Sequence, residues 1–471
     1  MVASAAPSDI GRHCGPPWLA IFGELTMTVK DYAGYAVSGA NTAGVEAFEQ
    51  ASHELRCYIN DPVASVDRAI AAAPDMVMAH ALKAWMHLMG TEPAGLPVAR
   101  ACHQAGAALP ANERERGHLQ AIRLVTEGLW RDAGRVLEDV SAAYPRDPLA
   151  LQAGHLIDFF TGDSRMLRDR MARALPAWDL KVPGYHAVLG MHAFGLEETG
   201  DYARAEKTGR RSVELEPRDG WGQHAVAHVM EMQNRPRDGI AWMRANPDAW
   251  SRDSSFAVHN WWHVAVFHLE VGDVDEVLRL YDGPINGKRS RIILEMIDAT
   301  ALLWRLHLRG VDVDSRWEAL ADDWAPVATA GNYAFNDVHA MIAFVGAHRS
   351  KAQRAVLESQ RHALAGSGDN VLFTREVGYP AALAIQAFEE GNYAECVRLL
   401  RPIRSYAHRF GGSHAQRDLL DLTLIEAALR GDIRPLASAL ARERIALRPE
   451  SPLSQLFVRR SEALGTSAVA A

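Results

Sequence analysis

Two pairs of histidines stand out in residues 221–272, and each pair has a spacing of four residues. His224 precedes His228, and His259 precedes His263. Residues four apart lie on one face of an α-helix, one turn from each other, so each pair directs two imidazoles to the same side. Glu231 follows His228 by three residues and shares that face. The stretch therefore concentrates side chains that can bind a metal ion or transfer a proton.

Tryptophans accompany both pairs. Trp221 lies just before the first pair, and Trp261 and Trp262 lie within the second. Large aromatic side chains can form the apolar walls of a ligand pocket, although they are more often core residues. We expect these three tryptophans to line a pocket beside the histidines.

The elements that must position these residues are helices, because turn signals recur at a near-constant period. The turn residues Gly90, Gly128, Gly162, Gly200, Asn234, Gly272 and Gly310 are spaced 38, 34, 38, 34, 38 and 38 residues apart. Glycine or asparagine at such a point supplies the left-handed conformation that ends a helix. Prolines mark the opposite corners, for example in YPRDPLA and EPRDGWG, since proline cannot continue a helix.

This period, with a glycine turn between two helices and a proline after them, predicts an all-α fold of tetratricopeptide-like helical hairpins. Such hairpins bury their apolar faces by stacking on their neighbours, so we expect a single superhelix, an α/α solenoid. We predict an N-terminal arm at 1–45, the superhelix at 46–463 and a flexible tail at 464–471. Residues 364–380 lengthen one interval, and we interpret them as a loop insertion.

Residues 217–345 resemble the tetratricopeptide repeat protein 38 family. The resemblance depends on HAVAHVMEM (224–232), HNWWHVAVFHLE (259–270), YDGPI (281–285), IDATALLWRL (297–306) and FNDVHAMIAF (335–344). It implies an α-helical repeat fold, and it implies no particular activity. The consensus residues of ordinary tetratricopeptide repeats are poorly kept, so the resemblance does not bring a peptide-docking role.

The repeat also predicts which polar side chains meet. Measured back from the turn residue of its own repeat, each candidate falls on the first helix of a hairpin, and we expect these first helices to line the concave face. The candidates for catalysis are His224, His228, His259, His263 and Asp298, and those for ligand binding are His186, Trp221, Glu231, Trp261, Trp262, Asp337 and His339.

Three functions compete for this set. The first is a pocket that binds a small organic molecule and converts it by acid–base chemistry, as a hydrolase or lyase would. The second is a scaffold without catalytic activity that binds a protein segment along the groove. The third is a metal-dependent enzyme, because neutral imidazoles suit Zn, Cu, Ni or Fe, and Glu231 and Asp298 could bind the ion or orient its ligands. A purely structural alternative is that these side chains are hydrogen-bonded polar residues within a tightly wound superhelix.

The bulk composition excludes several other classes. The chain has 471 residues and a net charge of −8, and no clustered basic face points to nucleic acid. No run of eighteen apolar residues suggests a membrane span, and the first residues lack the pattern of a signal peptide. The four cysteines are scattered and form no zinc spacing, so we expect reduced thiols in a cytoplasmic protein. A homo-oligomer is compatible with this composition.

Overall fold

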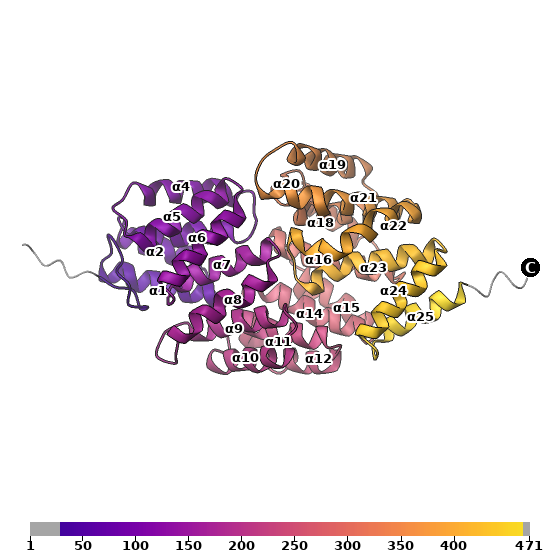
Figure 1. Ribbon diagram of the computed structural model, residues 1–471, viewed down its shortest axis with the longest axis horizontal. Helices are drawn as coiled ribbons and strands as arrows, with labels where there is room; N and C mark the ends of the chain where they lie inside the picture. Colours follow the sequence, from indigo (N-terminus) through magenta and orange to yellow (C-terminus); the bar gives the residue numbers. More distant parts are fainter. Residues whose placement is uncertain (1–28, 465–471) are drawn as a thin grey trace, which may run out of the picture.

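The computed structural model describes residues 29–464, and the helices within it follow one another as antiparallel pairs (Figure 1). The first part of the chain contains α1 (Thr42–Cys57), α2 (Pro62–Ala72), α3 (Val77–Leu88), α4 (Gly95–Ala107), α5 (Glu113–Thr126), α6 (Trp130–Ala143), α7 (Pro148–Phe160), α8 (Ser164–Ala174), α9 (Tyr185–Glu197) and α10 (Tyr202–Leu215). The middle part contains α11 (Gly220–Met232), α12 (Pro236–Arg244), α13 (Pro247–Ser251), α14 (Ala257–Glu270), α15 (Val274–Leu280), α16 (Ile293–Leu308) and α17 (Arg316–Trp324). The last part contains α18 (Ala334–Gly346), α19 (Ser350–Leu364), α20 (Asp369–Phe373), α21 (Tyr379–Glu389), α22 (Tyr393–Ile403), α23 (His414–Arg430), α24 (Arg434–Leu447) and α25 (Pro452–Ala463).

The all-α repeat fold is confirmed. Within residues 29–464 no sheet forms, and β-structure is limited to the isolated bridges Lys30–Ala36 and Ile59–Ser254. The short segments η1 (Leu175–Ala177), η2 (Tyr281–Ile285), η3 (Thr374–Gly378) and η4 (Arg404–Phe410) are also helical. Most of the predicted N-terminal arm, residues 1–28, and nearly all of the predicted tail lie outside the described residues.

The predicted turns occur where the glycine spacing places them. Gly128, Gly162, Gly200, Gly272 and Gly310 all have positive φ, and so does Asn234. At the turn predicted at Gly90, the positive φ belongs to the next residue, Thr91. In the repeat that follows Gly310, it belongs to His348, two residues after Gly346. In those repeats the helix extends slightly further, and a residue other than glycine adopts the left-handed conformation.

The two helices of each hairpin form an inner and an outer layer. In α11 every residue from Gly220 to Glu231 is buried, whereas in α12 only Gly239 and Met243 are buried. The sequences explain this difference, because α11 carries no charged residue before Glu231 while α12 carries Arg237, Asp238 and Arg244. A helix that is buried on all sides belongs to the interior. The first helices thus form the inner layer, as predicted.

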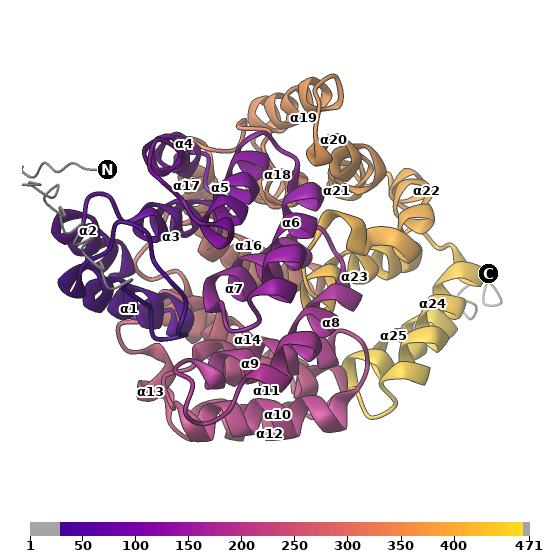
Figure 2. The same ribbon diagram turned by 60° about the vertical axis from the view of Figure 1, so that its left-hand side comes forward.

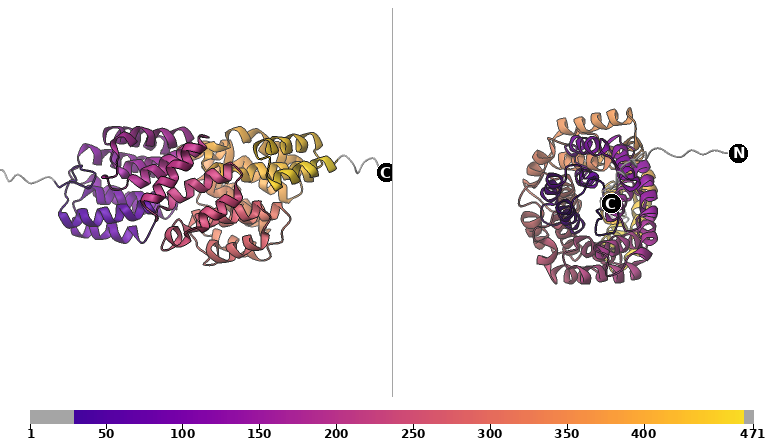
Figure 3. Two further views of the ribbon diagram at one scale, coloured as in Figure 1. Left: turned by 90° about the horizontal axis from the view of Figure 1, so that it is seen from below. Right: turned by 90° about the vertical axis from the view of Figure 1, so that its left-hand side faces the viewer.

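Successive turns of the superhelix pack against each other (Figure 2), and the helices form a ring when the molecule is viewed along its long axis (right-hand view of Figure 3). Hydrogen bonds join Thr91 to Asn336, Arg131 to Asp369, and His414 to Glu198, pairs that are 245, 238 and 216 residues apart. α23 packs on α16 and on α11. The first helices of the middle repeats are therefore in contact with a later part of the chain.

One local prediction was wrong. Residues 364–380 are not a loop, because they contain α20, η3 and the start of α21. The segment makes a helical connection in which Asp369 accepts a hydrogen bond from the Arg131 backbone N–H of the preceding superhelical turn. Its glycines suggested a loop, but this contact with a distant helix holds it in helical form.

None of the helices described combines the length and the apolar character that crossing a bilayer requires. The three described cysteines, Cys57, Cys102 and Cys396, are buried free thiols.

Candidate functional site

Four histidines meet in the inner layer, and we refer to His224, His228, His259 and His263 as the histidine cluster. Each offers one ring nitrogen to a common space, and these atoms all lie within 4.8 Å of one another. The ring centroids of His224 and His228 are 4.3 Å apart, and those of His228 and His263 are 4.6 Å apart. The two predicted pairs, one on α11 and the other on α14, therefore face the same point.

Carboxylates on neighbouring first helices bind the outer nitrogens of this cluster. Nδ1 of His263 lies 3.0 Å from Oε2 of Glu231, and Nδ1 of His259 lies 2.9 Å from Oδ1 of Asp298. A carboxylate accepts only, so each Nδ1 carries the hydrogen, and Nε2 of the same ring presents a lone pair. Asp298, which we predicted as a catalytic group, thus fixes the tautomer of His259.

A third carboxylate belongs to Glu197 on α9. Its Oε2 lies 3.5 Å from Nδ1 of His228, without hydrogen-bond geometry, and the Glu197 side chain is fully buried. Three of the four imidazoles therefore have a carboxylate on the side that faces away from the cluster. Histidines that bind metal ions usually have such a partner, which orients the ring and raises its basicity.

Several ring nitrogens of the cluster have no hydrogen-bond partner. Both ring nitrogens of His228, Nδ1 of His224 and Nε2 of His263 are buried without a hydrogen bond. Nε2 of His224 donates to Nε2 of His259 at 3.0 Å, so these two nitrogens bond only to each other. A buried polar atom without a partner costs about 1–3 kcal/mol, so this arrangement is unfavourable unless something fills the space between the rings.

Close helix packing brings Glu197 to the cluster. Gly190 on α9 and Gly222 on α11 pack directly on each other, because a Cβ at Gly190 would lie 3.2 Å from the Gly222 backbone. A Cβ at Gly222 would in turn lie 2.6 Å from Oγ of Ser212. The absence of side chains at these two positions lets α9 approach α11. Glu197, at the end of α9, then lies beside His228 on α11.

Aromatic side chains surround the cluster. His259 stacks on Trp262 with 5.5 Å between ring centroids, and His224 stacks on Phe194 at 5.3 Å. The ring centroids of Trp221 and His224 are 5.1 Å apart. The histidines are sealed from solvent except at one edge, where the side chain of His259 is 15% exposed. A small ion or molecule can therefore reach the cluster only past His259.

Burial governs the protonation of these groups. It lowers the pKa of His224, His228 and His263 well below the usual value, and the neighbouring imidazoles act in the same direction. Burial also raises the pKa of Glu197 well above its usual value, with Glu198 adding to the effect. Burial thus favours the neutral form of these three histidines, which is the form that binds metal ions.

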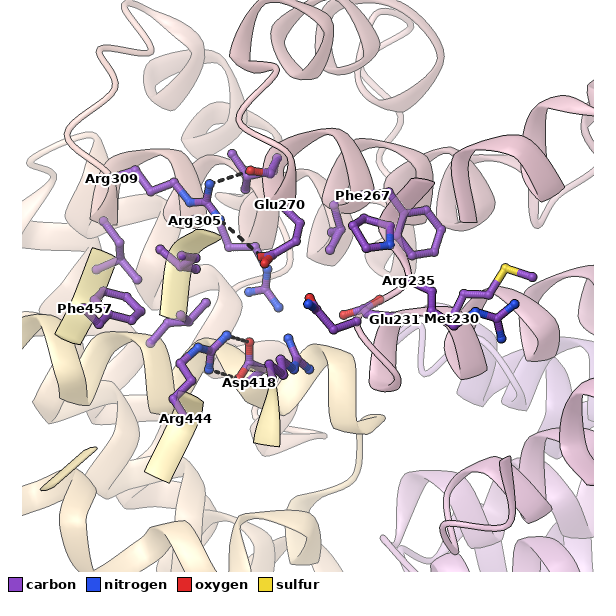
Figure 4. Close-up of a pocket in the computed structure, with 18 of the residues that line it drawn as sticks. Met230, Glu231, Arg235, Phe267, Glu270, Arg305, Arg309, Asp418, Arg444 and Phe457 are labelled. Atoms are coloured by element: carbon purple, nitrogen blue, oxygen red, sulfur yellow. Dashed lines mark hydrogen bonds and ion pairs between the residues drawn. The ribbon is translucent and has the colours of Figure 1, made fainter. Parts of the chain in front are cut away.

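A small cavity borders Glu231 between α11, α14, α16 and the C-terminal hairpins (Figure 4). It has a volume of about 40 Å³ and is lined by charged side chains that include Glu270, Arg305, Asp418 and Arg444. Pockets for organic ligands usually measure about 300–1,000 Å³, whereas this space suits a few water molecules. It does not match the pocket that we expected for a small organic molecule.

Other predicted site residues lie apart from the cluster. Trp261 packs against Trp250, with ring centroids 4.8 Å apart. His186 lies 2.8 Å from Oδ2 of Asp219, and on α18 the Nδ1 of His339 bonds to the carbonyl of Phe335. Asp337 is also buried on α18, and burial raises its pKa to about 7. The structure thus brings together seven of the predicted residues: His224, His228, His259, His263, Asp298, Glu231 and Trp262, with Trp221 at the edge.

Glu197 was missed by the sequence analysis. A signal for it was present, since Glu197 precedes the turn residue Gly200 by three positions, just as Glu231 precedes Asn234 by three. Equal positions in successive repeats occupy equal places on the inner layer. Extending the comparison from histidines to carboxylates would have identified it.

No known protein-family profile matches this chain. Among solved structures, the crystal structure of yeast Tom70 is similar over 87% of this chain and 85% of that chain, with 14% sequence identity and a TM-score of 0.31. This similarity is low, so the functional interpretation depends on the geometry of the site.

Proposed function

We propose that this helical-repeat protein binds a transition-metal ion in its inner layer through the histidine cluster. The observation that carries the proposal is the convergence of four ring nitrogens within 4.8 Å, in a space where several of them have no hydrogen-bond partner. A tetrahedral zinc ion with Zn–N distances of about 2.0–2.1 Å would separate its ligand nitrogens by about 3.4 Å. Small side-chain movements bring the cluster to that geometry.

The ligand set indicates the class of metal. Four neutral imidazoles suit Zn²⁺, Cu²⁺, Ni²⁺, Co²⁺ or Fe²⁺, whereas Mg²⁺ and Ca²⁺ prefer oxygen ligands. The carboxylates of Glu231 and Asp298 orient His263 and His259 and partly offset the charge of the ion. The stretch that resembles the tetratricopeptide repeat protein 38 family, residues 217–345, contains the whole cluster, and we include membership of that family in the proposal.

The geometry favours metal binding over hydrolysis. Structural zinc sites use four protein ligands, and catalytic ones keep a position open for water or substrate. Four histidines fill a tetrahedral shell, and the site meets solvent only at the edge of His259. Acid–base conversion of an organic molecule is a weaker candidate, since the cluster is buried and only His259 is partly exposed to solvent.

The test is elemental analysis of protein purified without an affinity tag, before and after incubation with Zn²⁺ or Co²⁺. We expect one tightly bound ion that depends on the cluster, and its loss in His228→Ala and in His263→Ala. The matched control is His339→Ala, which removes an equally buried histidine on α18. Circular dichroism checks the helical fold of each variant. An unchanged metal content in both cluster variants, or a wild type that binds neither ion, would refute the proposal.

A further inference from the structure

A second group of metal-binding side chains lies where α1 faces α9. His53 and Cys57 are four residues apart on α1, so they share one face of that helix. With His186 on α9, they offer three ligand atoms within 4.8 Å of one another. Sγ of Cys57 is 3.9 Å from Nδ1 of His53. None of these residues belongs to the histidine cluster.

His186 is oriented as a metal ligand would be. Its Nδ1 donates to Oδ2 of Asp219 at 2.8 Å, so its Nε2 presents a lone pair. Asp219 is itself fully buried and held in place, because it also accepts from Oγ of Ser212 and from the backbone N–H of Gly222. This repeats the arrangement of His259 with Asp298.

A buried cation lies beside the group. Arg56 precedes Cys57, is 6% exposed, and has an Nε without a hydrogen-bond partner. It lies against the turn that begins α9, since a Cβ at Gly184 would be 2.9 Å from its Nε. No carboxylate of the described residues lies within ion-pair distance of it, and the charge of Glu49 acts on it from further away. Burial raises the pKa of the Cys57 thiol and the charge of Arg56 opposes this, and metal coordination is what stabilises a thiolate in such a place.

We propose a second metal site in which Cys57, His53 and His186 bind a zinc-like ion through one sulfur and two nitrogens. Binding releases the thiol proton to solvent, and the ion takes the thiolate as its ligand. Three protein ligands leave a fourth position, on the half-buried side of His53, for water or an external ligand. The site thus has the open coordination that the histidine cluster lacks, and it does not depend on the cluster's being a metal site.

The experiment is titration of the metal-free protein with Co²⁺, read by the thiolate-to-cobalt charge-transfer absorption and by the number of ions bound. We expect two Co²⁺ per chain and a thiolate band in the wild type. Cys57→Ser should abolish the band and keep one ion, whereas His263→Ala should keep the band and lose the other ion. Cys396→Ser, which changes an equally buried cysteine without histidine neighbours, should behave as the wild type does.

The two proposals fail in different ways. A single bound ion with the thiolate band would refute only the histidine cluster. Absence of the band in the folded wild type, or a band that survives Cys57→Ser, would overturn the second site. His186→Ala, with the fold checked by circular dichroism, gives an independent reading, since it should weaken the band and leave the cysteine unchanged.

Discussion

His118 and the histidine cluster are equally buried and differ in where their hydrogen bonds go. His118 on α5 is fully buried, its Nε2 donates to Oδ2 of Asp147 at 2.9 Å, and its Nδ1 accepts from Nε1 of Trp85 at 3.2 Å. Both of its ring nitrogens are therefore satisfied within the protein. In the cluster, the outer nitrogens of His259 and His263 are satisfied in the same way, but Nε2 of His259 bonds only to His224 and Nε2 of His263 has no partner.

The surroundings of His118 show what a structural histidine does. Asp147 accepts from His118 and also caps the start of α7 through the backbone N–H groups of Leu149 and Ala150. Although burial opposes it, the hydrogen bond from His118 and the charge of Arg114 hold the pKa of Asp147 well below its usual range. The network ties α5 to α7 and needs nothing from outside. Burial alone thus does not identify a ligand site, and we base the proposed metal site on unsatisfied ring nitrogens that converge on one point.

The largest expected effect that separates the two regions is on metal affinity. Removing two ligands at once in His228→Ala/His263→Ala should weaken binding by far more than the roughly 10–100-fold that loss of an orienting group causes. His118→Ala should leave affinity unchanged, because neither of its nitrogens faces the cluster. Competition with a chromophoric chelator measures both. Equal weakening by the two changes would show that His118 and the histidine cluster do not differ in metal binding.

Metal removal should act on the cluster and spare the His118 region. Binding to the native state alone adds about 4 kcal/mol to stability when the free ion is at about 1,000 times its dissociation constant. We therefore expect a chelator to lower the melting temperature of the wild type measurably. In a Cys57→Ser background, which removes the second proposed site, the double cluster variant should melt at the same temperature with and without chelator, and a chelator effect that persists in it would contradict this assignment.

Asp337 extends the comparison to a buried carboxyl that faces no histidine. Burial raises its pKa to about 7, so the native state keeps the proton that the unfolded chain loses near pH 4. Its contribution to stability is full below about pH 4 and falls as pH rises toward 7. Asp337→Asn should therefore stabilise the protein at pH 8, by up to about 4 kcal/mol, and have little effect near pH 4. Urea unfolding at both pH values tests this, and a larger gain at pH 4 would show the opposite sign.

His118→Ala should be a stability change and nothing more. It leaves the buried carboxylate of Asp147 without one partner and opens a cavity, and breaking a buried charged pair costs about 3–5 kcal/mol. We expect a loss near the lower value, because Arg114 remains 3.8 Å from Asp147. Denaturant unfolding of the metal-loaded protein measures it. Metal loss from a variant that still folds would mean that His118 belongs to the site.

The smallest effect concerns the carboxylates that orient the cluster. Asp298→Asn keeps a side chain of the same shape but removes the charge that holds His259, so metal affinity should fall about 10–100-fold. The same change at Asp147 should leave the affinity as it is. Isothermal titration with Zn²⁺ distinguishes the two variants. An unchanged affinity in Asp298→Asn would show that this carboxylate does not contribute to metal binding.

The sequence was sufficient for the helical pairs and for most of the cluster, for different physical reasons. Turn residues such as Gly200 and Gly272 act locally, so their spacing predicted the hairpins. The spacing of four in His224–His228 fixed the face of each pair, and the repeat aligned the two pairs. The prediction of a loop at 364–380 failed because the helical form of this segment depends on contacts with residues far away in the chain. The packing of α23 on α16 and α11 depends on distant contacts in the same way.

For the individual site residues, too, the sequence predicted the general position but not the contacts. Asp298 was placed beside His259 by the repeat, but its role as an orienting group followed only from the observed hydrogen bond. His339 shares the inner layer, yet its Nδ1 bonds to its own helix at the carbonyl of Phe335. Equal positions in a repeat bring side chains to one layer, and local packing decides which of them meet.

X-ray absorption at the metal edge would identify the ligands of the ion in the Cys57→Ser variant loaded with one equivalent of Zn²⁺, in which the sulfur-containing group does not contribute. We expect an ion bound by four imidazole nitrogens at about 2.0–2.1 Å, with the imidazole signal reduced in His263→Ala. A first shell dominated by oxygen, or a spectrum that is the same in both proteins, would contradict the proposed site.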